Sequence, residues 1–198
     1  MKVHSKILGT LAVGALVAAL TVVGGGVAHA AQATSPVQPA DGTVQALTDP
    51  NTCSIQTSGG FYVTAVSGGG RITDVMHTNA TRVGSWEKFT LVYTGDGLHY
   101  GLRTVFGYYL TAVNSGGLTT ATTPDVLHSD ATNLLNWEKF SFVNNGDGGP
   151  GQPSTWGIRA FDGHYLTALD GGGRTFAAFN SNESTVRSWE KFRITCGI

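Results

Sequence analysis

The tetrapeptide Trp-Glu-Lys-Phe combines a flat aromatic surface, a carboxylate and an ammonium group, and it occurs three times in this chain. The copies begin at Trp86, Trp137 and Trp189, so successive copies lie 51 and 52 residues apart. A catalytic site seldom comes in three equal copies. We therefore interpret the tetrapeptide as architecture, with each Trp and Phe in the core and each Glu and Lys at its exposed edge. The functional alternative is three identical charged sites.

Short polar side chains precede each of these tryptophans at equal distances of nine, seven and five residues. Such groups, set in a planar array, can bind the hydroxyl groups of a sugar. The alternative is that they bond to their own backbone in turns. The single carboxylate of the set, Asp130, predicts that the second copy dominates any sugar binding. The candidate ligand-binding residues are His77, Asn79, Thr81, His128, Asp130, Thr132, Asn180, Asn182 and Ser184.

A second aromatic position recurs before a Thr-Ala pair, at Tyr62, Tyr109 and Tyr165. A tyrosine ring offers a sugar a flat apolar face together with a hydroxyl group, so stacking at these residues is possible. The alternative is that the rings pack against a neighbouring hairpin.

Motifs of known catalytic chemistry are missing from the sequence. The chain has no Gly-x-Ser-x-Gly elbow, no Cys-x-x-Cys pair and no His-Glu-x-x-His helix. Its glutamates are the three repeated ones and Glu183, which does not suggest the paired carboxylates of a glycoside hydrolase. We expect no catalytic residues, no metal site and no cofactor, and therefore not an enzyme.

The repetition extends well beyond the tetrapeptide. Upstream of each copy a Gly stands two positions before the Tyr of "YVTA" or "YLTA", and a glycine-rich turn follows. Apolar and polar residues alternate within each copy, which is typical of half-buried strands. A period of about 50 residues with three copies favours an all-β β-trefoil, a six-stranded barrel capped by three hairpins, because propellers usually have four or more blades.

The first thirty residues have the layout of a secretory signal peptide, with Lys2 and Lys6 before an apolar stretch and "AHA" before a cleavage site after Ala30. A retained membrane anchor is the alternative, since the stretch is nearly long enough to span a bilayer. Residues 31–50 are predicted to form a flexible linker, and residues 51–198 the trefoil domain. The protein is thus expected to be secreted, with no membrane contact after cleavage.

Charge and cysteine content agree with that prediction. Loss of Lys2 and Lys6 leaves ten basic against thirteen acidic residues, a net charge of about −3, and no basic stripe for nucleic acid exists. The two cysteines, Cys53 and Cys196, lie at opposite ends of the predicted domain. In an oxidising space they can form a disulfide, which requires the first and last strands to be neighbours. Two buried free thiols are the alternative.

The combination of "YLTA", a glycine-rich turn and "WE-x-F" resembles the fascin-like β-trefoil family over the whole of residues 51–198. Fascins bundle actin, so the resemblance implies actin filaments as a partner. The chain differs from fascins because it holds one trefoil rather than several in series, and because it is expected to be exported. Fold analogy alone does not transfer function.

Single exported trefoils also resemble lectin-like glycan-binding modules, although the Gln-x-Trp motif of the familiar lectin trefoils is absent here. We therefore expect a monomeric, non-catalytic module that binds polysaccharide or cell-surface glycan. One alternative is a fascin-like protein that binds the actin filaments of a host. A trefoil protease inhibitor is the other, and it would use the loop "NNGDGGPGQPSTW" that interrupts the symmetry.

Overall fold

The computed structural model describes residues 51–198, and the predicted signal peptide and linker lie outside this range. Twelve short strands alternate with turns, and the described residues contain no α-helix. The strands are β1 (Thr52–Gln56), β2 (Tyr62–Ala65), β3 (Met76–Ala80), β4 (Lys88–Tyr93), β5 (Tyr100–Arg103), β6 (Tyr109–Ala112), β7 (Leu127–Ala131), β8 (Phe140–Asn144), β9 (Trp156–Ala160), β10 (Tyr165–Ala168), β11 (Phe179–Glu183) and β12 (Arg193–Cys196). Four 3-10 turns complete them: η1 (Val66–Gly68), η2 (Val113–Ser115), η3 (Asn136–Glu138) and η4 (Leu169–Gly171).

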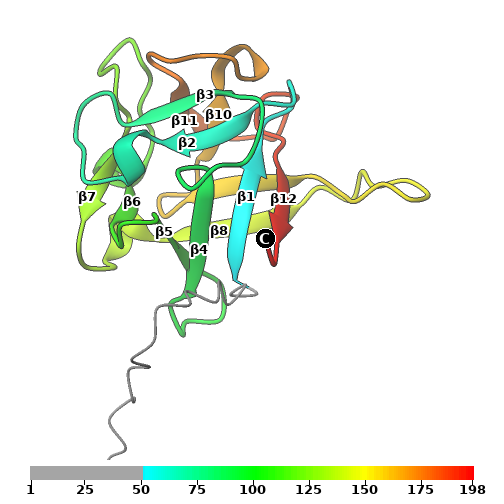
Figure 1. Ribbon diagram of the computed structural model, residues 1–198, viewed down its shortest axis with the longest axis horizontal. Helices are drawn as coiled ribbons and strands as arrows, with labels where there is room; N and C mark the ends of the chain where they lie inside the picture. The colour runs from blue at the N-terminus through cyan, green and yellow to red at the C-terminus, as the bar shows by residue number, and fades with distance from the viewer. Residues whose placement is uncertain (1–50) are drawn as a thin grey trace, which may run out of the picture. The chain divides into compact units, whose positions relative to one another are not determined.

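Two kinds of antiparallel pairing organise these strands. Neighbouring pairs β1–β4, β4–β5, β5–β8 and β8–β9 form the barrel, which β12 closes by pairing with β1 and by a bridge between Trp156 and Phe192. The pairs β2–β3, β6–β7 and β10–β11 form three hairpins, each with a register shift at the same place. Figure 1 shows the barrel strands β1, β4 and β12 side by side. The predicted β-trefoil is confirmed.

The phenylalanines of the three tetrapeptides lie at the centre of the core. Phe89, Phe140 and Phe192 are at most 1% exposed. They share one cluster with Leu102, Ile158 and other aliphatic residues from all three units. The prediction that these phenylalanines are buried is therefore confirmed, and the threefold repeat of Phe reflects a threefold core.

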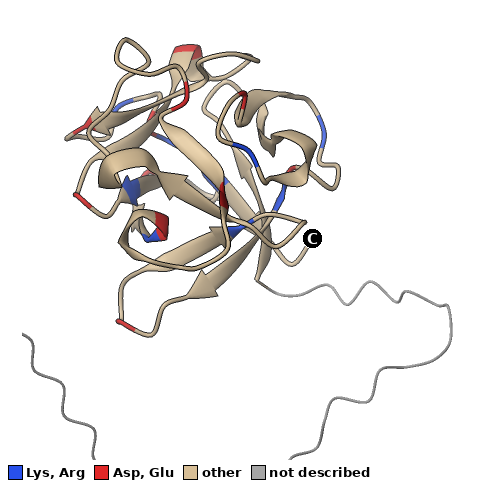
Figure 2. Cartoon of the chain, turned by 90° about the vertical axis from the view of Figure 1, so that its left-hand side faces the viewer, with Lys and Arg blue, Asp and Glu red and all other residues tan. Residues whose placement is uncertain are grey.

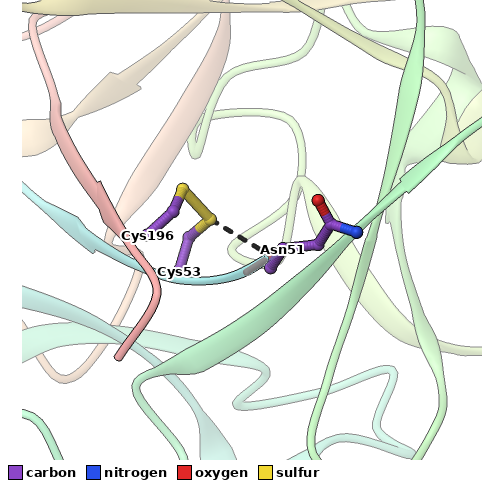
Figure 3. Close-up of a disulfide and its surroundings, with 3 residues drawn as sticks. All are labelled: Asn51, Cys53 and Cys196. Atoms are coloured by element: carbon purple, nitrogen blue, oxygen red, sulfur yellow. Dashed lines mark hydrogen bonds between the residues drawn. A yellow bond between two sulfur atoms is a disulfide. The ribbon is translucent and has the colours of Figure 1, made fainter. Parts of the chain in front are cut away.

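A disulfide joins the two ends of the described chain. Cys53 of β1 lies directly opposite Cys196 of β12, and their sulfur atoms are bonded (Figure 3). The sulfur of Cys53 also lies 3.3 Å from the backbone oxygen of Asn51. Both the predicted bond and the predicted pairing of first and last strands are confirmed.

A cyclic set of contacts ties the three units together. One fully buried hydroxyl residue stands on the third strand of each unit, at Thr78, Ser129 and Ser181. The backbone oxygen of each accepts a hydrogen bond from a glycine turn of another unit, at 2.6 to 2.7 Å. Because each turn is anchored on a different unit, no unit can shift independently of the other two. The three glycines that donate are Gly70, Gly117 and Gly173.

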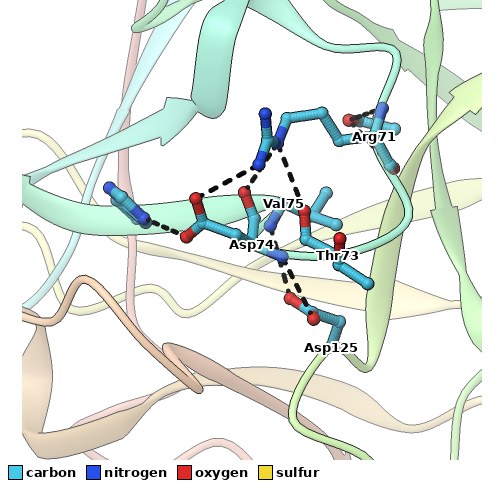
Figure 4. Close-up of polar contacts among 7 residues, drawn as sticks. Arg71, Thr73, Asp74, Val75 and Asp125 are labelled. Atoms are coloured by element: carbon cyan, nitrogen blue, oxygen red, sulfur yellow. Dashed lines mark hydrogen bonds and ion pairs between the residues drawn. The ribbon is translucent and has the colours of Figure 1, made fainter.

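A polar cluster reinforces the contact between the first two units. Figure 4 shows Asp125 of the second unit accepting the backbone N–H groups of Asp74 and Val75 in the first, at 3.2 and 3.3 Å. Arg71 donates to the backbone oxygens of Thr73 and Asp74 at 3.2 and 3.1 Å. The loop before β3 is thus fixed by both its own side chains and a neighbouring unit.

The segment that breaks the symmetry is the hairpin between β8 and β9, which extends away from the barrel in Figure 1. Its base is held by Asp147, which accepts from the Thr155 N–H at 2.8 Å and from the Lys191 ammonium at 2.9 Å. The Lys191 ammonium, with help from Thr155, holds the pKa of the Asp147 carboxyl well below its usual range.

This lowered pKa predicts an acid-sensitive hairpin. The carboxylate of Asp147 stabilises the folded state above its unfolded pKa of about 3.9, and that contribution is lost as the pH falls towards the lower folded pKa. We expect the difference in unfolding free energy between the wild type and Asp147→Asn to shrink steadily from pH 5 to pH 2. Chemical denaturation at several pH values measures it. A constant difference would show that Asp147 does not stabilise the hairpin through its charge.

Candidate functional site: three tryptophan surfaces

Each glutamate of the repeat is buried, and its carboxylate bonds to two segments of the chain. In the third unit, Glu190 accepts from the hydroxyl of Thr167 at 2.7 Å and from the backbone N–H of Arg187 at 2.8 Å. A buried carboxylate is stable only with such partners. The same pair of bonds recurs from Thr64 and Gly84 to Glu87, and from Thr111 and Leu135 to Glu138, at 2.7 to 2.9 Å.

This arrangement, called here the glutamate clamp, positions the tryptophan beside it. The backbone N–H that each glutamate accepts belongs to the residue two positions before the Trp. In the first and third units, the backbone oxygens of Trp86 and Trp189 also accept from Ala65 and Ala168, at 2.9 and 3.0 Å. The loop that carries the tryptophan is therefore anchored to the first strand of its hairpin, β2 or β10.

The tryptophan rings themselves lie at the surface. Trp86, Trp137 and Trp189 are 44%, 46% and 43% exposed, whereas the adjacent glutamates are at most 8% exposed. The predictions of buried tryptophans and exposed glutamates were both wrong. Trp and Glu lie in the turn before the last strand of each unit, which in the second unit is the 3-10 turn η3. This turn directs each Glu towards the Thr of its hairpin and leaves each Trp at the surface.

Hollows in the surface adjoin two of these rings. Beside Trp189 lies a cavity of about 350 Å³, lined among others by Asn180, Glu183 and Arg187. A more open hollow of about 530 Å³ is lined by residues 134–139, which include Trp137 and the aliphatic Leu134 and Leu135. An exposed ring beside a hollow with polar groups can accept a flat, hydroxylated ligand.

The polar residues nine positions before each Trp lie half-buried on the hairpins. Asn180 lines the cavity of Trp189, and its side-chain oxygen accepts from the Thr120 N–H at 2.8 Å. His77 contacts the Asp74 carboxylate at 2.7 Å. His128 occupies the equivalent register, opposite Thr111. Of the three, Asn180 lines the hollow beside the tryptophan of its own unit, whereas His128 does not line the hollow of Trp137.

The remaining predicted polar residues occupy the same three hairpins, so the structure distributes the nine candidates over three separate surfaces. Asn79 and Asp130 are exposed, whereas Asn182 is half-buried with a side-chain oxygen that has no hydrogen-bond partner among the described residues. Neither the hollow beside Trp137 nor that beside Trp189 is lined by these three residues. The hydroxyl residues Thr81, Thr132 and Ser184 are all exposed.

The repeated tyrosines contact the strand that precedes their own. A Cβ placed on Gly101 would lie 3.0 Å from the ring of Tyr109, and one on Gly157 would lie 2.9 Å from the ring of Tyr165. These glycines therefore leave room for the rings. In addition, the guanidinium of Arg159 lies 5.9 Å from the centre of the Tyr165 ring. For Tyr109 and Tyr165 these contacts support the packing interpretation; Tyr62 occupies the same register and is half-buried.

Residues 51–198 contain neither a cluster of metal-binding side chains nor a membrane-spanning helix. No group of three or more His, Cys, Asp or Glu side chains there could hold a metal ion. None of the helical segments in the same range is long and apolar enough to cross a membrane. Figure 2 shows acidic and basic residues interspersed over the strands and loops, without one continuous basic stripe.

Comparison with known proteins identifies the fold. No protein-family model and no curated protein sequence matches this chain. Among solved structures it is similar to ThreeFoil, a designed threefold-symmetric protein, with a TM-score of 0.59 and 14% identity over 73% of this chain and 97% of ThreeFoil. It is also similar to the Rhizoctonia solani agglutinin, with a TM-score of 0.55 and 18% identity over 74% of this chain and 95% of the agglutinin.

A third similar structure belongs to an enzyme. The exo-β-1,3-galactanase 1,3Gal43A from Clostridium thermocellum matches with a TM-score of 0.57 and 12% identity over 75% of this chain but only 30% of the enzyme. At such identities the likeness establishes the fold alone. The trefoil implied by the resemblance to fascins is therefore confirmed, whereas membership of the fascin family stays a prediction.

Proposed function

We propose that this protein is a secreted, non-catalytic module that binds polysaccharide or cell-surface glycan through its three exposed tryptophans. The observation that carries the proposal is the threefold exposure of Trp86, Trp137 and Trp189, each on a loop fixed by a buried glutamate. Exposing three large aromatic rings forgoes the stabilisation that burial would give, while the clamp holds them in place. Such preorganised surfaces are suited to ligand binding.

The chemistry around the rings fits a sugar. The apolar face of a pyranose ring can pack on an indole ring, while its hydroxyl groups bond to amide, imidazole and carboxylate groups nearby. Asn180 beside Trp189 supplies such a group, and His77 and His128 supply the equivalents in the other units. We assign the residues at seven and five positions before each Trp, all of them exposed except the half-buried Asn182, to outer contacts with the same ligand.

Two further observations support the proposal at a coarser level. The disulfide between Cys53 and Cys196 is typical of proteins that fold in an oxidising, extracellular compartment. The similar structures include an agglutinin and a galactanase that matches over a part of its length only. Together they favour an extracellular binding module over an enzyme.

A retention assay on immobilised neutral polysaccharides and a glycan array test the proposal, with co-sedimentation on actin filaments in parallel. We expect wild-type protein to be retained by at least one glycan, and each of Trp86→Ala, Trp137→Ala and Trp189→Ala to weaken binding at its own site about fivefold to tenfold. Phe176→Ala is the matched control, because Phe176 is 68% exposed but lies outside the two tryptophan hollows.

Two results of these assays would contradict the proposed glycan binding. Sedimentation with actin without retention on any glycan would favour the filament-binding alternative. Equal loss of retention in Phe176→Ala and in the tryptophan variants would show that exposed aromatic surface in general causes the binding.

A further inference from the structure

The third unit carries a second hollow that adjoins the one at Trp189. This cavity of about 290 Å³ lies where the third unit meets the first, and Gln56, Thr155, Lys191 and Arg193 are among the residues that line it. Ser188 lines both cavities. A Cβ on Gly171 would lie 3.2 Å from the Ser58 hydroxyl and 3.7 Å from the Trp189 ring, so these two cavity residues are close neighbours. The two hollows thus form one extended groove, called here the unit-three groove.

Three cationic side chains line the unit-three groove. Arg187 belongs to the cavity of Trp189, and Lys191 and Arg193 belong to the second cavity. At the positions of Arg187 and Arg193 the first unit has Gly84 and Thr90, and the second has Leu135 and Ser141. The paired cationic positions are thus confined to one of the three units.

The two arginines are available to a ligand. Lys191 is paired with Asp147 at 2.9 Å. Among residues 51–198 no carboxylate lies within ion-pair distance of Arg187 or Arg193. A guanidinium presents a planar fork of donors that fits a carboxylate or a sulfate with two hydrogen bonds. The rest of the lining includes Ser58 and Ser188, whose hydroxyls can bond to the hydroxyl groups of a sugar.

We propose that the unit-three groove binds a chain of an acidic polysaccharide, with one sugar on Trp189, its anionic group at Arg187, and the anionic group of a neighbouring sugar at Arg193. This inference rests on the proposed glycan-binding function and assigns it a substrate class. The anionic group is a uronate carboxylate or a sulfate ester, because each presents two negatively charged oxygens that can accept hydrogen bonds from one guanidinium.

The proposal also assigns different ligands to the second and third units. Asp130 in the second unit repels an anionic sugar and accepts hydroxyls from a neutral one. The expectation that the second unit dominates binding therefore applies to neutral glycans, and the third unit selects acidic ones. Glu183, in the cavity of Trp189, accepts hydroxyl groups there and disfavours anions placed away from Arg187.

Affinity measurements on the full chain with matched probes test this inference. The probes are polygalacturonate and its carboxyl-reduced form, dextran sulfate and dextran, and an oligodeoxythymidylate of comparable charge. We expect polygalacturonate or dextran sulfate to bind at least about tenfold more tightly than its neutral counterpart, with weaker binding at higher salt. Arg187→Gln and Arg193→Gln should each lower that affinity about fivefold. Arg103→Gln is the control, because Arg103 is exposed on β5 outside the groove.

Each other outcome has a definite meaning. A preference for only one of the two acidic polymers identifies the anionic group and supports the proposal. Equal affinity for acidic and neutral forms overturns it while leaving the glycan-binding function intact. Equal affinity for the oligodeoxythymidylate also overturns it, because the groove would then bind any polyanion. Failure of all probes and of the neutral glycan panel would reject the proposed function itself.

Discussion

Replacing Glu190 with alanine is expected to lower the free energy of unfolding by about 3 kcal/mol. The change leaves the Thr167 hydroxyl and the Arg187 N–H without their buried acceptor, at 2.7 and 2.8 Å in the wild type, and each such loss costs about 1 to 3 kcal/mol. For a protein of this size the melting temperature should fall by about 6 to 12 °C. Thermal and chemical denaturation monitored by circular dichroism measure both quantities.

Three further variants make this test specific. Glu190→Gln keeps the shape and one acceptor, so it should cost about half as much as Glu190→Ala. Thr167→Val removes only the hydroxyl partner, and its effect should be strongly non-additive with Glu190→Ala in a double-mutant cycle. Glu183→Ala is the control, because Glu183 is half-buried and has no ion-pair partner among the described residues. Similar stability losses at positions 183 and 190 would contradict the clamp.

Removal of the disulfide is expected to have the other large effect on stability. The bond joins residues separated by 143 positions, and restraint of so long a loop in the unfolded chain stabilises the folded state by about 4 to 5 kcal/mol in the chain-entropy model. Cys53→Ala/Cys196→Ala should therefore unfold at a markedly lower denaturant concentration than the oxidised wild type, measured by guanidinium titration.

The reduced wild type is the matched comparison for this double variant, because it lacks the bond but keeps both cysteines. Its unfolding midpoint should lie close to that of the variant. An unchanged midpoint in both proteins would mean that the pairing of β1 with β12 holds the barrel closed without the bond.

The fold could be predicted because the same sequence pattern occurs three times in the chain. A period near 50 residues, alternating apolar residues and a cysteine at each end of the domain together limit the choice of fold to a closed three-unit barrel. The buried phenylalanines Phe89, Phe140 and Phe192 follow from the same alternation. These features depend on local pattern and count, which a single sequence contains.

Exposed Trp and buried Glu are the reverse of the sequence-based prediction, because polarity alone places Trp inside and Glu outside. Strand alternation does not correct this prediction, since Trp189 and Glu190 lie in a turn rather than in β12. One sequence signal does point to the clamp: the Thr of each Thr-Ala pair and the Glu of each tetrapeptide repeat together. The buried carboxylate of Glu190 still needs the hydroxyl of Thr167, which lies 23 residues earlier in the sequence. Only the tertiary structure brings these two side chains together.

The unit-three groove illustrates the other limit of sequence analysis. Arg187 and Arg193 stand out in the aligned units because uncharged residues occupy the equivalent positions. The approach of Gln56 and Ser58 to Ser188, however, arises only when the barrel closes between the two ends of the domain. Repetition reveals what the units share, and contacts between units determine where they differ in function.

The indole N–H signals in a ¹⁵N NMR titration test the central claim most directly. The chain has four tryptophans, so four indole signals are expected, and single Trp→Phe variants assign them. Addition of a glycan that the protein retains should shift the signals of exposed Trp86, Trp137 and Trp189, in one unit or more, while Trp156 serves as the internal control because it lines neither tryptophan hollow. A bound glycan that leaves all three signals unmoved would contradict the account.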